Sequence, residues 1–403
     1  MKAYMVKSDK KIEPFGDHPR DCLIANKKLN DYQQGILREL ELDLQLIEEN
    51  TTIDDTDEYI VFPDSLYFNK DLLVDFISES QKIQRNTVCA IKPGTFTLRT
   101  VVTTQDVTIF EDRIEYQLYY VSANNQQGDS TPIIIDADAY HENLPMPEHL
   151  CSAPGYDIPL PDKMVIQIDH WTNLWAANIA TLLEPAASLM KTPKWKLLGK
   201  AIKAGSLNQW KIVSRMNSIG KNCDIHPTAY VEGSVIGDNV TIGAGSVVRE
   251  CYIGNNASVE NNVTLNFTVI GEEGYIADGS IIRYSVIYPK TFFGFGTLSC
   301  QMLGHNCFIG DGVTLADYRI DGRCITVIKN GLVIDTAIKF LGSCLGNDTY
   351  LAAGTIVDPG RTIPNGTHVV PENHDIIQRI TLDGAIINYR QVNNIMVEKK
   401  TFY

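Results

Sequence analysis

The chain has 403 residues, of which 44% are hydrophobic and 21% charged, a composition typical of a globular protein with two or three domains. Its formal net charge of −14 argues against a nucleic-acid-binding protein, because such proteins present basic surfaces. No apolar run approaches the ~20 residues that span a bilayer, so we do not expect a membrane protein.

The N-terminus and the cysteines indicate the cellular compartment. The first residues, MKAYMVKSDKKIEPFG, contain no long apolar segment, so we expect no signal peptide. The nine cysteines form no CxxC pair, and an odd number cannot all pair with one another. We therefore expect a cytoplasmic protein with reduced thiols rather than a disulfide framework or a zinc site.

The first 92 residues alternate between strand and helix patterns. We predict strands over 3–6, 59–62 and 87–91, and helices over 31–41 and 71–78. This order favours a mostly parallel sheet with flanking helices. From Thr95 to Ile135 the pattern becomes strand-like with hairpin-sized gaps, so we expect antiparallel strands to be added there. The proline-rich residues 144–162 are predicted to be extended.

An amphipathic helix is predicted to begin at Trp171, with Pro185 ending its first part. Thr192 and Pro193 are typical of a second helix start. That second helix is basic, with lysines at positions 191, 194, 196, 200 and 203. It is either a solvated face between two domains or a surface for an anionic ligand or membrane.

Residues 218–370 carry an internal repeat of 17 residues. Three aliphatic columns keep this step over four or five turns, beginning at Ile219, Ile225 and Val231. The pattern indicates the hexapeptide repeat of a parallel β-helix, whose coils bury their apolar columns by stacking. The repeat is interrupted over 316–343 and resumes at Leu345. A loop that leaves a rigid coil is a typical place for function.

Two blocks of the sequence resemble a known family. They are MLGHNCFIGDGVTLADYRIDG (302–322), followed by DTAIKFLGSCLGNDTYLAAGTIVDPG (335–360), and IDHWTNLWAANIATLL (168–183). Both resemble the two-domain sugar-1-phosphate nucleotidylyltransferases that end in a left-handed β-helix, such as the bifunctional N-acetylglucosamine-1-phosphate uridylyltransferase/glucosamine-1-phosphate acetyltransferases and their archaeal relatives. The resemblance implies an α/β, Rossmann-like nucleotidyltransferase domain, then a left-handed parallel β-helix of hexapeptide repeats.

The N-terminal domain departs from that family. The family's glycine-rich phosphate loop is replaced by VKSDKKIEPFG (6–16), which contains one glycine, and a loop that approaches phosphates closely needs glycine. Arg20 stands where the resemblance places a catalytic lysine. Asp64, in YIVFPDSLYF (59–68), stands where relatives bind Mg²⁺.

The β-helix also departs from the family. The resemblance implies a histidine base one rung before Gly304, but the corresponding position is Gly294. His305 is the neighbouring candidate for a general base, although a surface corner residue is the alternative. The resemblance further implies acceptor binding by Asp317, Tyr318 and Lys339, an acyl-CoA such as acetyl-CoA as donor, and a homotrimer.

Three functions remain open from the sequence. The first is nucleotidyl transfer to a sugar 1-phosphate, with Arg20, Asp64 and Mg²⁺. The second, slightly favoured, is acyl transfer from acyl-CoA to a sugar phosphate or related small molecule, with His305. The third is a catalytically inactive trimeric scaffold or ligand sensor. The predicted organisation is a degenerate nucleotidyltransferase-like domain (1–167), a helical linker (168–217), the β-helix (218–370) and a C-terminal extension (371–403).

Overall fold

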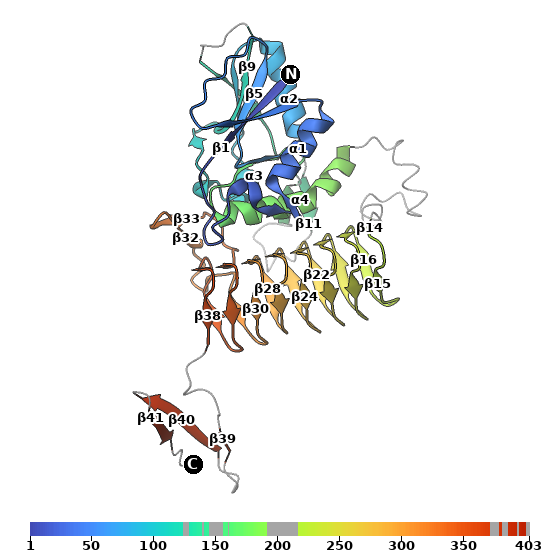
Figure 1. The fold of residues 1–403 in the computed structure, drawn as a ribbon, viewed down its shortest axis with the longest axis vertical. Helices are drawn as coiled ribbons and strands as arrows, with labels where there is room; N and C mark the ends of the chain where they lie inside the picture. Colours follow the sequence, from blue (N-terminus) through green and yellow to red (C-terminus); the bar gives the residue numbers. More distant parts are fainter. Residues whose placement is uncertain are drawn as a thin grey trace.

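The structure is a computed structural model that describes residues 1–123, 129–138, 141–144, 156–159, 161–191, 217–370, 379–380, 386–392 and 395–399. The predicted basic helix lies outside the described residues apart from Lys191, and so does most of the proline-rich segment. The expected fold class is confirmed: a mixed α/β domain lies above a long stack of short parallel strands (Figure 1).

The N-terminal domain is built on a mixed sheet with the strand order β10-β7-β9-β5-β1-β4. Its strands are β1 (Lys2–Lys7), β4 (Asp43–Glu48), β5 (Tyr59–Pro63), β7 (Thr87–Ile91), β9 (Ile114–Val121) and β10 (Thr131–Ile135), with β8 (Thr108–Ile109) pairing on β9. The predicted strands near 3–6, 59–62 and 87–91 are therefore present. β9 runs antiparallel between β5 and β7, and β10 returns parallel to β7.

Two helices pack on this sheet. They are α1 (Leu29–Glu39) and α2 (Lys70–Ile83), close to the predicted ranges. α2 begins at Asn69, whose side chain accepts a hydrogen bond from Leu72 N at 3.2 Å, a typical N-cap. The strand prediction beyond Thr95 was partly wrong. Thr95–Arg99 forms a short helix, α3, followed by the 3₁₀ turn η2 (Val102–Thr104), because Gly94 and Thr97 cap a helical turn there.

Short elements complete this domain. They are η1 (Pro19–Asp21), the hairpin β2 (Leu23–Ile24) with β3 (Lys27–Lys28), the hairpin β11 (His141–Leu144) with β12 (Tyr156–Pro159), and the antiparallel pair β6 (Leu66–Phe68) with β13 (Val165–Gln167).

The second domain is a parallel β-helix with three faces. The first face is β14 (Ser218–Ile219), β17 (Val235–Ile236), β20 (Tyr252–Ile253), β23 (Val269–Ile270), β26 (Val286–Ile287), β29 (Met302–Leu303), β34 (Cys344–Leu345) and β37 (Thr362–Ile363). The second is β15 (Asp224–Ile225), β18 (Thr241–Ile242), β21 (Ser258–Val259), β24 (Tyr275–Ile276), β27 (Phe292–Phe293), β30 (Phe308–Ile309), β35 (Tyr350–Leu351) and β38 (His368–Val369).

The third face is shorter. It comprises β16 (Tyr230–Glu232), β19 (Val247–Arg249), β22 (Thr264–Asn266), β25 (Ile281–Arg283) and β28 (Thr297–Ser299), and then the pair β31 (Thr314–Leu315) and β36 (Ile356–Val357). The three predicted aliphatic columns each stand in one face, and their inner members are buried, such as Ile253, Val259 and Leu265. The 17-residue period therefore predicted correctly which residues of successive coils lie next to each other.

The predicted interruption of the coil is a hairpin. β29 pairs directly with β34, with Met302 opposite Cys344, so the intervening residues leave the coil and return to it. They form the antiparallel strands β32 (Thr326–Lys329) and β33 (Leu332–Asp335). Ile325 and Val327 are buried with the core of the N-terminal domain. The hairpin therefore ties the β-helix to that domain.

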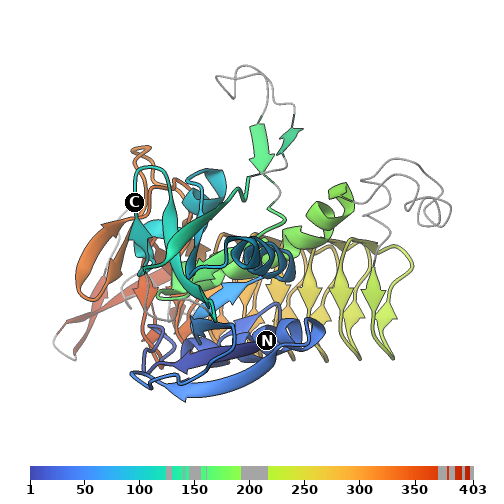
Figure 2. The same cartoon turned by 90° about the horizontal axis from the view of Figure 1, so that it is seen from above.

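Helix α4 (Trp171–Lys191) lies between the two domains (Figures 1 and 2). It continues past Pro185, contrary to prediction, because a helix can continue past a proline at the cost of one hydrogen bond. Trp171 and Leu174 are buried in the N-terminal core. Trp175 donates from its indole nitrogen to Tyr284 O at 2.8 Å on the β-helix. One continuous core therefore joins α4, the N-terminal sheet and the first face of the coil.

Residues beyond Val370 include β39 (Arg379–Ile380), β40 (Ile386–Val392) and β41 (Ile395–Lys399), which form a small antiparallel sheet. In the part of the chain that the structure describes, no helix is long and apolar enough to cross a membrane.

Candidate functional site

Asp64 and Arg20, two residues singled out in the sequence, lie together at the carboxyl edge of the N-terminal sheet. Asp64 directly follows β5, and Arg20 lies on η1. Arg20 Nη1 is 2.7 Å from Asp64 Oδ2, and the Asp64 side chain is completely buried. Because parallel strands end at one edge of a sheet, the loops after β1 and β5 meet here, which is where α/β proteins bind ligands.

The loop after β1 completes the surroundings of this carboxylate. Ser8 donates its backbone N–H to Asp64 Oδ2 at 3.2 Å and its hydroxyl to Asp64 Oδ1 at 3.0 Å. Arg20 also donates to Ser8 O at 3.1 Å. Both oxygens of Asp64 therefore accept hydrogen bonds from within the chain.

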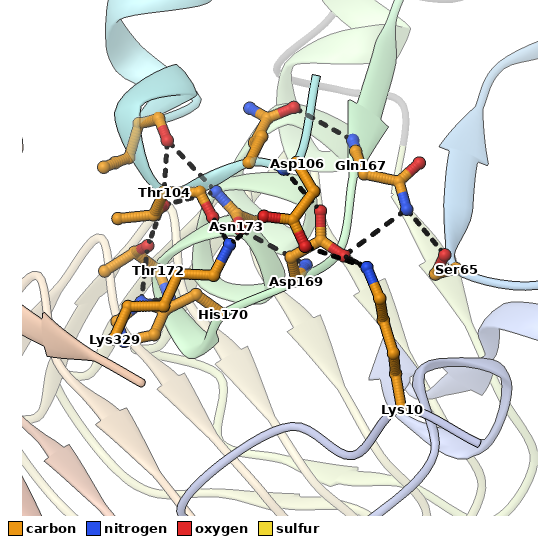
Figure 3. A network of polar contacts seen from close by, with 12 residues as sticks. Lys10, Ser65, Thr104, Asp106, Gln167, Asp169, His170, Thr172, Asn173 and Lys329 are labelled. Carbon is orange, nitrogen blue, oxygen red and sulfur yellow. Dashed lines mark hydrogen bonds and ion pairs between the residues drawn. The ribbon is translucent and has the colours of Figure 1, made fainter. Parts of the chain in front are cut away.

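A second buried carboxylate is linked to this edge through Lys10, which follows β1. Asp169 follows β13, and its side chain is 1% exposed. Lys10 Nζ lies 3.0 Å from Asp169 Oδ1 and 2.8 Å from Asp106 Oδ2. Gln167 connects the two carboxylates, since its amide donates to Ser65 Oγ at 2.6 Å, next to Asp64, and lies 3.5 Å from Asp169 (Figure 3).

The β-helix contributes a cation to this network. Lys329, near the turn of the β32–β33 hairpin, donates to Asp106 Oδ1 at 2.5 Å and to Thr104 O at 2.8 Å (Figure 3). Its side chain is only 13% exposed. We call Ser8, Lys10, Arg20, Asp64, Asp106, Asp169 and Lys329 the carboxyl-edge site.

The charges of this network stabilise one another. Burial lowers the pKa of Lys10, but its contacts with Asp106 and Asp169 outweigh burial and raise it above the usual value. Burial raises the pKa of Asp106, whereas hydrogen bonds from Lys10 and Lys329 bring it below the usual value. These groups are therefore held in their charged forms.

His170 secures the hairpin beside this network. Its Nε2 donates to Ile328 O at 3.2 Å, and its Nδ1 lies 2.9 Å from the Thr172 hydroxyl. Burial lowers the pKa of His170 to about 4, although the hydrogen bond to Ile328 opposes this. His170 is therefore neutral at pH 7 and has a structural role.

The carboxyl-edge site does not fit a magnesium ion. Mg²⁺ requires octahedral oxygen ligands, but the oxygens of Asp64 accept from Ser8 and Arg20, and Asp169 accepts from Lys10 and from Asp106 N at 2.7 Å. Arg20 also places a fixed positive charge where a cation would bind. Among the described residues, no group of three or more His, Cys, Asp and Glu side chains could hold a metal ion.

His305 lines a pocket between the two domains. This pocket of about 420 Å³, the seam pocket, is lined by Lys11, Gly16, Asp17, His18, Asp21, Leu23, Lys28 and His305. The His305 ring packs on Tyr288 with centroids 4.8 Å apart. Burial lowers the pKa of His305, against the charges of Asp17 and Asp348, which raise it. This histidine is therefore a partly buried residue at a corner of the β-helix, on the side that faces the N-terminal domain.

The predicted acceptor-binding residues lie elsewhere, where the excursion leaves and re-enters the coil. Asp317 accepts from Leu341 N at 3.0 Å through its backbone. Tyr318 stacks on Phe340 with ring centroids 5.1 Å apart, and Lys339 is exposed. None of these three residues is among those that line the pocket of His305.

Sequence reasoning missed Lys10, Asp106, Asp169 and Lys329. Asp169 had a usable signal, because an aspartate two residues after the buried strand β13 is similar to the placement of Asp64 directly after β5. Lys329 had none, since only the folded hairpin brings residue 329 next to residue 106.

Comparison with known proteins relates the β-helix to proteins of sugar-nucleotide metabolism. Residues 206–292 match the family described as the GMPPB C-terminal domain, a β-helix-type domain of GDP-mannose pyrophosphorylase. This part of the chain is thus similar to a domain of a sugar-nucleotide-pathway transferase. No curated protein matches the chain.

Proposed function

We propose that the carboxyl-edge site binds a sugar nucleotide without a resident metal ion. The protein would act in sugar-nucleotide metabolism as a protein of the transferase type. The pairing of Arg20 with Asp64 at 2.7 Å carries the proposal. Arginine, a backbone N–H and a hydroxyl are the donors that bind phosphate oxygens. Here Arg20 holds the buried Asp64 through Nη1, and its guanidinium, which is 28% exposed, is open on its other side to a phosphate oxygen of the ligand.

Two features support recognition rather than nucleotidyl transfer at this site. Arg20 and Lys10 supply positive charge that a metal ion would otherwise provide to phosphates. The loop after β1 lacks the glycines that allow close backbone approach to a triphosphate. Nucleotidyl transfer with Mg²⁺ is therefore the alternative that the test must separate.

Calorimetric titration with GDP-mannose and with UDP-N-acetylglucosamine, in EDTA and in Mg²⁺, tests the proposal. We expect one of them to bind equally well in both buffers. Arg20→Gln should weaken that binding about tenfold, the effect of losing one charge-assisted hydrogen bond. Arg249→Gln, a control on the exposed third face of the β-helix, should bind like the parent.

Strictly Mg²⁺-dependent binding, or unchanged binding by Arg20→Gln, would contradict the proposal. A separate assay mixes a nucleoside triphosphate, mannose 1-phosphate and Mg²⁺ and measures pyrophosphate. Pyrophosphate release that is lost in Asp64→Asn would establish nucleotidyl transfer instead.

A second candidate function is acyl transfer, favoured by the location of His305 in the seam pocket. Because burial lowers the pKa of His305, its imidazole is neutral at pH 7 and could accept a proton from an attacking amine or hydroxyl. Acetyl-CoA and a sugar phosphate are the substrates to assay. His305→Asn should lower turnover ~10²–10⁴-fold, whereas His226→Asn, at another coil corner, should not. Equal turnover in both variants would remove His305 as the base.

The homotrimer expected from the resemblance is part of both proposals. Sedimentation equilibrium of the full chain measures it directly, and a monomeric mass across the micromolar range would refute it.

A further inference from the structure

A column of aromatic side chains runs along the outside of the second face of the β-helix. Tyr275, Phe292, Phe308 and Tyr350 lead β24, β27, β30 and β35, and the residue after each of them is buried inside the coil. Their rings are stacked, with successive centroids 5.2, 5.0 and 6.2 Å apart. The ring of His368, on β38, lies 4.6 Å from that of Tyr350. We call these five residues the aromatic column.

The column is open to the outside. Tyr275, Phe308 and Tyr350 are 36%, 41% and 39% exposed, and they lie on successive coils between β24 and β35. Large contiguous apolar patches are rare on the surfaces of monomeric proteins and mark places where another surface binds. The column is therefore a candidate interface.

The other two faces of the coil show what covers an apolar column. The outward residues of the first face are also apolar, and Val269, Val286 and Met302 are buried there with the core of the N-terminal domain. In the coils of the third face that correspond to Phe292 and Phe308, the outward residues Thr297 and Thr314 are polar and exposed. On this coil, an outward column of apolar side chains therefore belongs to a covered face.

The stacking of the rings limits what can bind. The planes of Tyr275 and Phe292 differ by 7°, and those of Phe292 and Phe308 by 8°, so the ring faces cover one another and the ring edges point outwards. A nucleobase stacks on the face of an aromatic ring, and these faces are occupied. A row of ring edges instead forms an apolar ridge, which suits the apolar surface of another protein.

The spacing of this ridge suits a second copy of the same chain. Successive coils of a parallel β-helix lie ~4.8 Å apart, so side chains that pack between the rings must repeat with the same step. The second face of another copy has this step over its eight strands, which run from β15 at one end of the coil to β38 at the other (Figure 1).

The charges beside the column determine the direction of the second copy. Glu260 lies next to the Tyr275 hydroxyl, and burial together with this carboxylate raises the pKa of Tyr275. In an antiparallel pair with its two-fold axis between Phe292 and Phe308, the coil of Glu260 lies level with His368 of the second copy, which can donate a hydrogen bond to a carboxylate. In a parallel pair, Glu260 would lie level with Glu260 of the second copy, and like charges repel.

We propose that the aromatic column is the surface through which two copies of this chain associate, with their β-helices antiparallel about a two-fold axis. Such a contact is isologous, because both copies contribute the same residues. Alone it gives a dimer, and together with the expected trimer it gives a hexamer, so the number of copies is even. The column shares no residue with the carboxyl-edge site or the seam pocket, so the inference is independent of both candidate functions.

Sedimentation equilibrium of the full chain should therefore give two or six copies. Phe308→Glu places a carboxylate near the two-fold axis and should weaken the association at least about thirtyfold, an effect typical of a central interface residue. Tyr230→Glu, on the third face, is the matched control and should associate like the parent. Glu260→Gln should weaken the association about tenfold. Asp224→Asn, on the second face but beyond the overlap of the two columns, should leave it unchanged.

Cysteine cross-linking tests the direction without adding a charge to the column. Tyr275→Cys and Tyr350→Cys copies, expressed together and treated with a mild oxidant, should form a disulfide between positions 275 and 350. Mass spectrometry of the linked peptides identifies it. Neither variant should link to itself, because the antiparallel contact brings the two different positions together. A monomer, an isolated trimer, self-linked Tyr275→Cys, or parent-like association of Phe308→Glu would each overturn the proposal.

Discussion

Arg20 Nη1 lies 2.7 Å from Oδ2 of the fully buried Asp64. The sequence placed these residues in a nucleotidyl-transfer site, as a catalytic cation and as a metal ligand. In the structure they neutralise each other. Removing one member of a buried pair leaves an uncompensated charge, which typically costs 3–5 kcal/mol.

We therefore expect Arg20→Gln and Asp64→Asn each to destabilise the protein, by about 2–3 kcal/mol because Arg20 is partly exposed. The double variant should be less destabilised than the sum of the two, since no unpaired charge remains. Urea unfolding of the parent and the three variants measures this coupling. Additive effects would show that the pair contributes nothing beyond its separate contacts.

The neutral His170 predicts a pH dependence of stability. Its pKa is about 4 when folded, below the ordinary value of 6.5, so between these values the unfolded chain binds a proton that the folded chain does not. The stabilisation is complete above pH 6.5 and is lost as the pH falls towards 4, with a slope of up to about 1.4 kcal/mol per pH unit. Denaturant unfolding from pH 4.5 to 7.5 should show this slope, and His170→Gln should flatten it. An unchanged slope in the variant would assign the effect to other groups.

We expect loss of the Lys329 charge to speed amide hydrogen exchange in the β32–β33 hairpin only. Lys329→Gln removes the ion pair with Asp106 across the domain junction, so residues 326–335 should exchange amide hydrogens faster, by about tenfold. Lys290→Gln, which removes an exposed pair with Glu273 at 4.0 Å, is the control and should leave exchange unchanged. Parent-like exchange in Lys329→Gln would show that the apolar contacts of the hairpin are sufficient.

We expect the Tyr288 hydroxyl to stabilise the contact between the two domains. Its hydroxyl makes both hydrogen bonds to the Leu23 backbone, and Tyr288→Phe would leave those groups without this partner at a cost of about 1–3 kcal/mol. Thermal unfolding should show the loss, and limited proteolysis should cleave more readily in residues 11–28. Tyr350→Phe, where the ring is 39% exposed, is the control. Equal stability of both variants would mean that water replaces the lost hydroxyl.

The sequence alone determined the β-helix and much of the N-terminal domain. A 17-residue column places Ile236, Ile253 and Ile270 over one another, because parallel strands in a coil pair only in that register. Local patterns also located β7 and α1. They could not place β9 between β5 and β7, since pairing of strands distant in sequence depends on the whole sheet, and they missed that α4 continues past Pro185.

Only the tertiary structure decided what the candidate residues contact. Sequence reasoning found Arg20, Asp64 and His305 one at a time, from local motifs. Their partners come from remote segments: Lys329 reaches Asp106 across 223 positions, and His305 shares a pocket with Asp17 from the other domain. A local pattern determines where a strand or coil forms. The charge that a side chain meets depends on how the domains dock, and docking joins surfaces far apart in the chain.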